Sequence, residues 1–575
     1  MKIAYSLLHN RFNLMSRIFD FAVFPVIIFL LAFSVNFSCG VIDTMESGQY
    51  LSCVNAVFHG NIPYRDFIPP VGPFFIWILS IALFLFGKTI YTLKLYFLIA
   101  TIAVYIILYF FGRSLYRFRI SACILPVIAL VETYNPFWAT RWAGYSRMGS
   151  GLLGLFLQVI YIKKKNPAYL FLAGVAAAFA LLYGIDSGVF LIICGLCLCV
   201  LMGLYETNKG SRGNAINIIQ RGIIFCSGLA VILIPFMLYM AFNKAFLPYL
   251  EGTYLVMRYH MPAWHTPLPS FLGSFEYYNN SIWLFFSSDE FRIYMPRIFY
   301  FLAAIYAIYA IKNRKSIIDS VAIPVIVVYG IFAYISACRV VQGPQFDTGF
   351  LPLLLLLVYF IEKGVIFLVS NRLDFMKKEK FKKIAFGGII AVFVILISSL
   401  YIIYSYKRVY GSWPGWLEYQ KNKNNIIPVY SSLRKKDDIK LVTANIKGFG
   451  PILANEDEVR QMEAVTEYLA NNTSKGEPVF TFPEHGLYNF LADRPAATRF
   501  YIAAYAHTAD KWKKELLSEL QKNPPRYVVY SRQLSHVAKN ARKKNELLPE
   551  VAVFILENYH LEKEFGRIGI YKRNL

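Results

Sequence analysis

Charged residues are scarce in this sequence of 575 residues. Asp, Glu, Lys and Arg make up 16% of it, whereas hydrophobic residues make up 57%, and the mean hydropathy is +0.45. Soluble domains carry about 25% charged residues, so the composition excludes an ordinary soluble protein. Long apolar stretches recur from residue 21 to about residue 405, as they do in membrane-spanning helices. The sequence therefore predicts an α-helical polytopic membrane protein.

Acidic residues are scarcer than basic ones. The chain has 35 Asp and Glu against 59 Lys and Arg, a formal net charge of +24. In a soluble protein this balance would suggest nucleic acid, but here Lys and Arg collect in short loops between apolar stretches, as the positive-inside rule expects. We therefore expect membrane lipids, and no nucleic acid, as partners.

The basic loops also predict the topology. Lys2, Arg11 and Arg17 precede the first apolar stretch (21–38), so the N-terminus is expected in the cytoplasm. No small-residue cleavage site follows that stretch, so no cleavable signal peptide is expected. Placing the later basic clusters in the cytoplasm gives about eleven spans and an extracytoplasmic C-terminus. The ten expected spans after the first are 91–111, 120–134, 149–162, 168–184, 188–205, 222–243, 294–311, 318–338, 349–370 and 384–405.

One apolar stretch, residues 73–86, does not fit this alternation. It has about fourteen residues, a length typical of re-entrant or interfacial segments. A full span here would also move Arg113, Arg117 and Arg119 to the outer face, against the charge rule. We therefore predict that the segment enters and leaves the membrane on the external side.

Cysteines and metal-binding motifs are few. Six of the eight cysteines lie in or beside expected spans, where a thiol is a small apolar filler. Cys39 and Cys53 are both expected outside and could form a disulfide. The sequence has no H-E-x-x-H motif, no pair of C-x-x-C motifs and no P-loop, so it predicts no metal, nucleotide site or cofactor.

The chain changes character after residue 405. Residues 1–405 form the expected membrane domain, and residues 406–575 are polar and Lys-rich. Amphipathic stretches such as "EVRQMEAVTEYLANN" and "ADKWKKELLSELQKN" each precede a short β-rich run, Pro478–Phe482 and Arg526–Ser531. This alternation predicts a small extracytoplasmic α/β domain, which we expect to contain a parallel sheet. We expect it to recognise an acceptor or to stabilise the membrane domain as a lid.

The first external segment holds two carboxylates. Asp43 and Glu46 lie in "VIDTMESGQYL", and their i, i+3 spacing would place them on one face of a helix. Thr44 or Ser47 could cap such a helix. Two carboxylates beside a bilayer are costly unless they are paired, hydrated or used. A hydrated loop with two acids is an equally good interpretation of this segment alone.

Three external stretches together resemble the first external loop of GT-C membrane glycosyltransferases. These are the acidic motif, then "GNIPYRDF", then "PPVGPFFIWILSIALFLFG", which ends at Phe86–Gly87. The relatives in question are the protein O-mannosyltransferases and the aminoarabinose transferases of bacteria. The C-terminal "GEPVFTFPEHGLYNFLADRPAATRF" and "PPRYVVY" also look like the soluble tail of bacterial members. The sequence departs from the commonest pattern because its acidic motif is D-T-M-E rather than an adjacent Asp-Glu pair.

The resemblance implies transfer of a sugar from a polyprenyl-phosphate lipid to an extracytoplasmic acceptor. Such a transfer needs a carboxylate that takes the proton of the acceptor hydroxyl. By the resemblance, Asp43 is the preferred base, Glu46 is the alternative base, and Asp66 is a supporting acid. The prolines and Gly72 are expected to fix the turn that returns the chain to the membrane.

The departing lipid phosphate needs cations on the external side. The candidates are Arg65, Arg141, Arg147, Arg258 and Arg339, because arginine binds phosphate oxygens well. Each could instead be an arginine that anchors a span at the headgroups. Tyr64, His260 and His265 are candidate substrate residues, although an interfacial aromatic belt explains the two histidines as well.

These observations favour a metal-independent glycosyltransferase of the inner or plasma membrane. The alternative is a transporter or lipid flippase, in which Asp186 would be an intramembrane substrate or proton site. Against that alternative, the sequence has no evident two-fold repeat and carries a large external tail. A non-catalytic membrane scaffold is a third possibility that no residue excludes.

Overall fold

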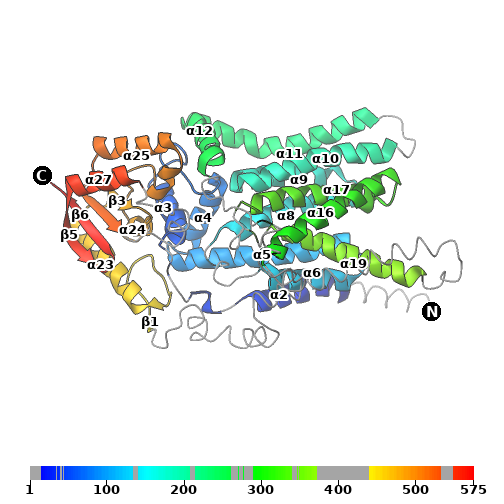
Figure 1. Cartoon of the computed structure of the whole chain (residues 1–575), viewed down its shortest axis with the longest axis horizontal. Helices are drawn as coiled ribbons and strands as arrows, with labels where there is room; N and C mark the ends of the chain where they lie inside the picture. Colours follow the sequence, from blue (N-terminus) through cyan, green and yellow to red (C-terminus); the bar gives the residue numbers. More distant parts are fainter. Residues whose placement is uncertain are drawn as a thin grey trace.

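The computed structural model describes residues 15–33, 35–38, 42, 44–133, 140, 142–207, 214–260, 270, 276, 289–339, 346, 349–371, 440–531 and 548–574. Long helices run side by side through most of the molecule, and a smaller α/β domain covers one end of them (Figure 1). The first described helix, Met15–Ala32, begins toward the opposite end of the bundle.

Ten of the eleven expected spans correspond to helices among the described residues, and the stretch 384–405 lies outside those residues. Six of the ten are long and apolar enough to cross a membrane, which makes the chain a multi-pass membrane protein. The helices are Met15–Ala32, α5 (Ile90–Leu115), α6 (Arg119–Thr133), α8 (Gly144–Lys164), α9 (Pro167–Tyr183), α10 (Ile185–Thr207), α11 (Asn214–Phe242), α16 (Asp289–Lys312), Ile318–Ala337 (η4 and α17) and α19 (Leu351–Asn371).

The first helix differs from its predicted bounds of 21–38. It contains η1 (Phe19–Val23) and α2 (Phe24–Ala32), and it ends at Ala32 because Phe33 adopts an extended backbone. Polar residues then follow, and Val35–Ser38 forms a 3-10 turn. The helix is already formed at Met15, the first described residue, and it ends six residues before the predicted end because apolarity alone does not mark where the helical backbone stops.

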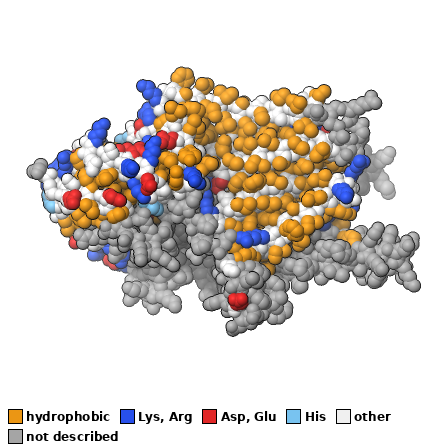
Figure 2. All heavy atoms as spheres, turned by 45° about the horizontal axis from the view of Figure 1, so that its top comes forward, with side chains coloured by type: hydrophobic (Ala, Val, Ile, Leu, Met, Phe, Trp, Pro, Cys, Tyr) orange, Lys and Arg blue, Asp and Glu red, His pale blue; other side chains and the backbone are white. Residues whose placement is uncertain are grey.

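Local signals explain several other helix ends. The Thr89 side chain accepts the N–H of Thr92 and caps α5, and Asn166 caps α9 ahead of Pro167. Such caps satisfy N–H groups that have no partner inside the helix. Hydrophobic side chains cover the visible outer face of the bundle, whereas charged ones gather over the α/β domain (Figure 2). Phe84 is 78% exposed and Phe242 is 84% exposed, which is costly in water and expected in lipid.

Two shorter helices lie where the bundle meets the α/β domain. Helix α3 spans Glu46–Phe58 and helix α4 spans Pro73–Phe86. Gly72 precedes α4 and packs against the end of α9, since a Cβ there would lie 2.1 Å from the Leu182 carbonyl oxygen. At the other end of α4, Lys88 donates to Asp493 of the α/β domain at 2.9 Å. Both ends of α4 therefore lie at the end of the bundle that the α/β domain covers.

The α/β domain contains a four-stranded sheet in the order β3-β4-β6-β5. Strands β3 (Val479–Phe482) and β4 (Tyr527–Ser531) pair in parallel, as predicted. The sheet is nevertheless mixed rather than parallel throughout, because β5 (Tyr559–Phe565) and β6 (Ile568–Arg573) form an antiparallel hairpin that adds to β4. The hairpin turns at Gly566, whose φ is +59°. The charged run in β5 hides its strand pattern, since only one face of a hairpin at a sheet edge is buried.

The remaining elements of this domain pack helices and turns around the sheet. They are β1 (Leu441–Val442), β2 (Ala454–Asn455), α23 (Glu456–Asn472), α24 (Leu487–Leu491), η5 (Ala503–Thr508), α25 (Asp510–Lys522) and α27 (Pro549–Asn558). Helices α23 and α25 match the two amphipathic stretches that the sequence indicates.

The α/β domain shares a hydrophobic core with the membrane domain. One buried cluster joins Leu51 of α3 and Phe75 of α4 to Leu487 and Phe490 of α24. Lys88 also donates to Asn55 of α3 at 2.7 Å. The domain is therefore packed against α3 and α4, rather than tethered beside them.

Candidate functional site

Three helix ends and the turns beside them line a cavity that contains charged side chains. The cavity has a volume of about 40 Å³ and lies where α8 begins, α10 begins and α17 (Ile323–Ala337) ends. The polar and aromatic side chains that line it include Trp142, Arg147, Asp186, Ser336 and Arg339.

Arg147 and Asp186 form the centre of this cavity. One terminal nitrogen of Arg147, Nη2, donates to both carboxylate oxygens of Asp186, at 2.9 and 2.8 Å. Asp186 Oδ1 also accepts the N–H of Ser187 at 3.0 Å, and Ser336 donates to Oδ2 at 3.3 Å. These hydrogen bonds fix the Asp186 carboxylate, which in turn holds the Arg147 side chain in place.

Arg147 keeps hydrogen-bonding capacity beyond Asp186. Its Nε is buried and has no hydrogen-bond partner among the described residues. Gly184 makes room for this side chain, because a Cβ there would lie 2.8 Å from the Arg147 Nε. A buried guanidinium N–H without a partner is costly, so Arg147 retains an unused hydrogen-bond donor.

Arg339 adds a second positive charge to the cavity. It follows α17, lies half-buried, and makes no side-chain hydrogen bond or ion pair to another residue of the described ranges. Two arginines and one aspartate give the lining a formal charge of +1. The cavity therefore favours an anionic ligand.

Glu46 lies at the start of α3, and Tyr50 links it to Ala143, which stands between the cavity residues Trp142 and Gly144. Its carboxylate accepts hydrogen bonds from Gln49 and, at 3.4 Å, from the Tyr50 hydroxyl. The Tyr50 oxygen in turn accepts the N–H of Ala143 at 3.4 Å. Burial raises the pKa of Tyr50, Glu46 raises it further, and Arg147 opposes them. Tyr50 thus lies between the carboxylate and the arginine cavity.

Several predicted site residues cannot be placed. Asp43, Arg141 and His265 lie outside the described residues, as does Cys39, the expected partner of Cys53. His260 ends η3 (Val256–His260), and its side chain lies outside the description as well. Cys53 is a buried free thiol in α3.

Arg65 and Asp66 close the loop between α3 and α4. Arg65 donates to both Asp66 oxygens, at 2.8 and 2.7 Å, and to the Asn243 carbonyl at the end of α11, at 3.0 Å. Asp66 also accepts the N–H of Ile62 at 2.8 Å. Burial raises the pKa of Asp66, but the hydrogen bonds from Arg65 and Ile62 outweigh it and hold the pKa below 3.8. Arg65 and Asp66 therefore hold the loop between α3 and α4 in place, and we call this pair the loop clamp.

Tyr64 and Arg258 lie away from the cavity. Tyr64 is 3% exposed, has a φ of +67°, and meets Tyr249 of α12 (Phe246–Leu255) edge to face at 5.0 Å. Arg258 is exposed on η3 and stacks over Tyr259 at 5.9 Å. The structure thus brings Arg147 and Arg339 together and leaves Arg65, Arg258 and Tyr64 elsewhere.

Sequence reasoning missed residues that connect the predicted ones. Gln49 and Tyr50 follow Glu46 at i+3 and i+4 in α3, and that spacing could have identified them. Asp186 was considered only as a transport residue, whereas it is the partner of Arg147. His485, whose Nδ1 lies 3.2 Å from the Thr44 hydroxyl, could not be found because no local pattern links residues so distant in the sequence.

No group of three or more His, Cys, Asp or Glu side chains within the described ranges could hold a metal ion. Arg147 and Arg339 supply positive charge to the cavity. Such groups can offset negative charge on a ligand.

Comparison with known proteins gives fold-level similarity only. No family model matches the chain, and no curated protein matches it in sequence. The crystal structure of ArnT from Cupriavidus metallidurans bound to undecaprenyl phosphate is similar over 96% of this chain and 97% of that one, with a TM-score of 0.51 and 10% identity. Its apo form gives a TM-score of 0.48 at 11% identity, over 97% of this chain and 98% of that one. An Archaeoglobus fulgidus oligosaccharyltransferase gives 0.48 at 14% identity, over 88% and 68%. The first of these likenesses confirms the GT-C fold that the sequence resemblance predicts.

Proposed function

We propose, from the GT-C membrane glycosyltransferase fold that this chain shares with ArnT, that it moves a sugar from a polyprenyl-phosphate carrier to an extracytoplasmic acceptor. The ArnT structure contains undecaprenyl phosphate, and we carry that class of lipid to this chain. The observation that supports the proposal most is the positively charged cavity of Arg147, Asp186 and Arg339 beside Glu46.

Arg147 and Arg339 are the proposed ligands of the donor phosphate. Arg147 is held by Asp186 through one nitrogen and keeps a buried Nε to donate. Guanidinium groups form charge-assisted hydrogen bonds with phosphate oxygens. Arg141, which precedes the cavity residue Trp142 by one position, is a further proposed cation.

A carboxylate of the acidic motif at residues 43–46 provides the base. The acceptor hydroxyl gives its proton to Asp43 or, alternatively, to Glu46, while its oxygen forms a bond to the anomeric carbon. The bond from that carbon to the phosphate oxygen breaks, and its electron pair leaves with the lipid phosphate. Arg147 and Arg339 stabilise the negative charge that develops there. Asp66 supports this site indirectly, because it holds the loop between α3 and α4 in place.

The proposed orientation places the α/β domain outside the membrane. Residues 1–405 would form the membrane domain and residues 406–575 the extracytoplasmic domain, with the N-terminus in the cytoplasm. The stretch 73–86 is then an interfacial helix, since Gly72 at its start packs on the end of α9 and Lys88 after its end bonds Asp493 of the α/β domain. Arg65 and Arg258 lie at headgroup depth in this arrangement, where cations anchor a protein to lipid.

A transfer assay on the full chain in nanodiscs tests the proposal. The protein is incubated with a panel of radiolabelled polyprenyl-phosphate sugars and a membrane extract as the source of acceptors. We expect label to move from at least one donor, and Arg339→Gln to reduce the transfer. Lys244→Gln, which removes an exposed cation at the end of α11, is the matched control. Failure of the wild-type chain both to transfer label and to bind undecaprenyl phosphate would contradict the proposed function.

A further inference from the structure

The α/β domain contacts the carboxylate-bearing end of α3 directly. Residues 483–505, between β3 and the middle of η5, pack on residues 44–52 across the domain junction. The packing is tight, because a Cβ on Gly48 would lie 2.7 Å from the Leu487 backbone nitrogen. Among the polar contacts that cross this junction, two lie close to Glu46 along the chain.

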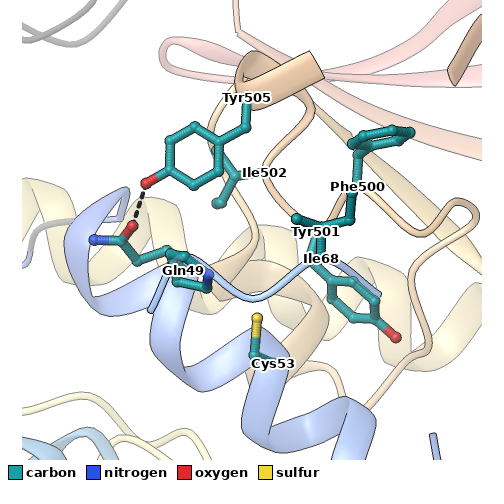
Figure 3. Close-up of a pocket in the computed structure, with 8 residues that line it drawn as sticks. Gln49, Cys53, Ile68, Phe500, Tyr501, Ile502 and Tyr505 are labelled. Atoms are coloured by element: carbon teal, nitrogen blue, oxygen red, sulfur yellow. Dashed lines mark hydrogen bonds between the residues drawn. The ribbon is translucent and has the colours of Figure 1, made fainter. Parts of the chain in front are cut away.

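The first contact leads from Tyr505 to Glu46 through one amide. The Tyr505 hydroxyl donates to Gln49 Oε1, and Gln49 Nε2 donates to the Glu46 carboxylate. Tyr505 and Gln49 face each other across a small pocket of about 10 Å³ that Cys53, Ile68 and Tyr501 also line (Figure 3). A space of this size holds about one water molecule or one hydroxyl group.

The Gln49 amide can make both hydrogen bonds in only one orientation. An amide side chain has one accepting end and one donating end, and a carboxylate only accepts, so Glu46 requires the NH₂ end of Gln49. The Tyr505 hydroxyl occupies the oxygen and leaves the NH₂ group for the carboxylate. With the amide reversed, its oxygen would face the carboxylate, and two acceptors would oppose each other.

The second contact lies on the other side of Glu46 along the chain. His485 Nδ1 lies 3.2 Å from the hydroxyl of Thr44, two residues before Glu46. Burial lowers the pKa of His485 to about 4, so the ring is neutral near pH 7. The α/β domain therefore holds residues 44–49 at both ends without adding a charge.

We propose that Tyr505 of the α/β domain is a positioning residue, which orients the Glu46 carboxylate through Gln49. This inference rests on the proposed function and extends it, because it makes docking of the α/β domain part of the transferase site. Tyr505 is not needed for the docking itself. The shared core and the hydrogen bond from Lys88 to Asp493 join the two domains independently.

Steady-state kinetics of the full chain in nanodiscs test the inference. Tyr505→Phe removes the hydroxyl and keeps the ring, and we expect kcat to fall by about threefold to tenfold, the range that one hydrogen bond supplies. The donor KM should stay unchanged because Arg147 and Arg339 are untouched. In a Gln49→Ala background, Tyr505→Phe should have no further effect, since the link to Glu46 is already cut. Tyr488→Phe, at a buried tyrosine of α24, is the matched control and should match the wild type.

Hydrogen exchange of α3 separates this inference from the proposed function. Amides of residues 46–52 should exchange faster in Tyr505→Phe than in the wild type and in Tyr488→Phe, whether or not a donor has been identified. Equal exchange in the three proteins would overturn the link between Tyr505 and α3. A loss of kcat that persists in full in the Gln49→Ala background would overturn the route through Gln49. A wild-type chain that transfers no sugar would instead refute the proposed function, and the exchange result would stand on its own.

Discussion

Arg147 of α8 is joined to Asp186 of α10 through a single nitrogen, which donates to both carboxylate oxygens. A side-by-side pair would use two nitrogens of the guanidinium. The arrangement found here uses one, and it leaves the buried Nε unpartnered within the described ranges. Asp186 therefore balances the charge of Arg147 without consuming its capacity to bind an anion.

Replacement of Arg339 and replacement of Arg147 should have different effects on thermal stability. Arg339→Gln should weaken binding of undecaprenyl phosphate by about tenfold to a hundredfold, the value of a charge-assisted hydrogen bond. Its thermal stability should be unchanged, because Arg339 has no ion-pair partner within the described residues. Arg147→Gln should weaken binding and also lower thermal stability, because it leaves Asp186 without its counter-charge. Equal stability losses in both variants would contradict this division of roles.

The carboxylates after the first helix should control turnover. General-base catalysis contributes about 10²-fold to 10⁴-fold, so replacing the base should lower kcat by that factor while the protein stays folded. Asp43→Asn is expected to have this effect, and Glu46→Gln tests the alternative. Turnover and thermal stability are measured together in nanodiscs. If both variants and the double variant keep near-normal transfer, these acids belong to a hydrated loop.

Gly184 should be needed for the position of Arg147. A Cβ at Gly184 would lie 2.8 Å from Arg147 Nε and 3.0 Å from its Cγ, so Gly184→Ala should displace the guanidinium. We expect Gly184→Ala to weaken lipid-phosphate binding, measured by ligand-induced thermal shift. Gly222→Ala is the matched control, because a Cβ there meets no atom within 4 Å. Normal binding by Gly184→Ala would show that the Arg147 side chain can shift without a loss of affinity for the lipid phosphate.

The clamp between Arg65 and Asp66 should open in acid. The folded pKa of Asp66 lies below its ordinary value of 3.8, so the clamp contributes its full stability above that pH. This stability is lost as the pH falls through the lower, folded pKa. Hydrogen exchange of residues 59–72 should therefore accelerate in that acidic range. Asp66→Asn should accelerate it already at pH 7, by a loss of about 1–3 kcal/mol, and should show little further change in acid.

The proposed topology predicts which sites react from outside the cell. Single cysteines at Gly60, Gly87 and Lys475 should be labelled in intact cells by an impermeant reagent. A cysteine at Lys164 should be labelled only after the membrane is opened. Labelling at Gly60 but not at Gly87 would mean that α4 crosses the membrane completely. Labelling at Lys164 from outside would reverse the orientation.

The sequence by itself determined the class of protein and the extent of most helices. Apolar stretches interrupted by basic loops are a local signal, because every span must satisfy its own backbone and meet lipid along its length. The strands Val479–Phe482 and Tyr527–Ser531 were predictable for a similar reason, since a short apolar run must be buried in a sheet. The hairpin of β5 and β6 was missed because most of β5 is exposed and charged.

Only the tertiary structure decided which polar residues meet. Arg147 and Arg339 are separated by 192 positions (339 − 147) and line one cavity because α8 and α10 begin where α17 ends. Arg65 and Arg258 have the same chemistry, but Arg65 bonds to Asp66 and Arg258 lies over the Tyr259 ring. Tyr505 reaches Gln49 only because the α/β domain packs on α3. Side-chain chemistry limits which interactions a residue can make. Packing between distant segments decides which partner it meets.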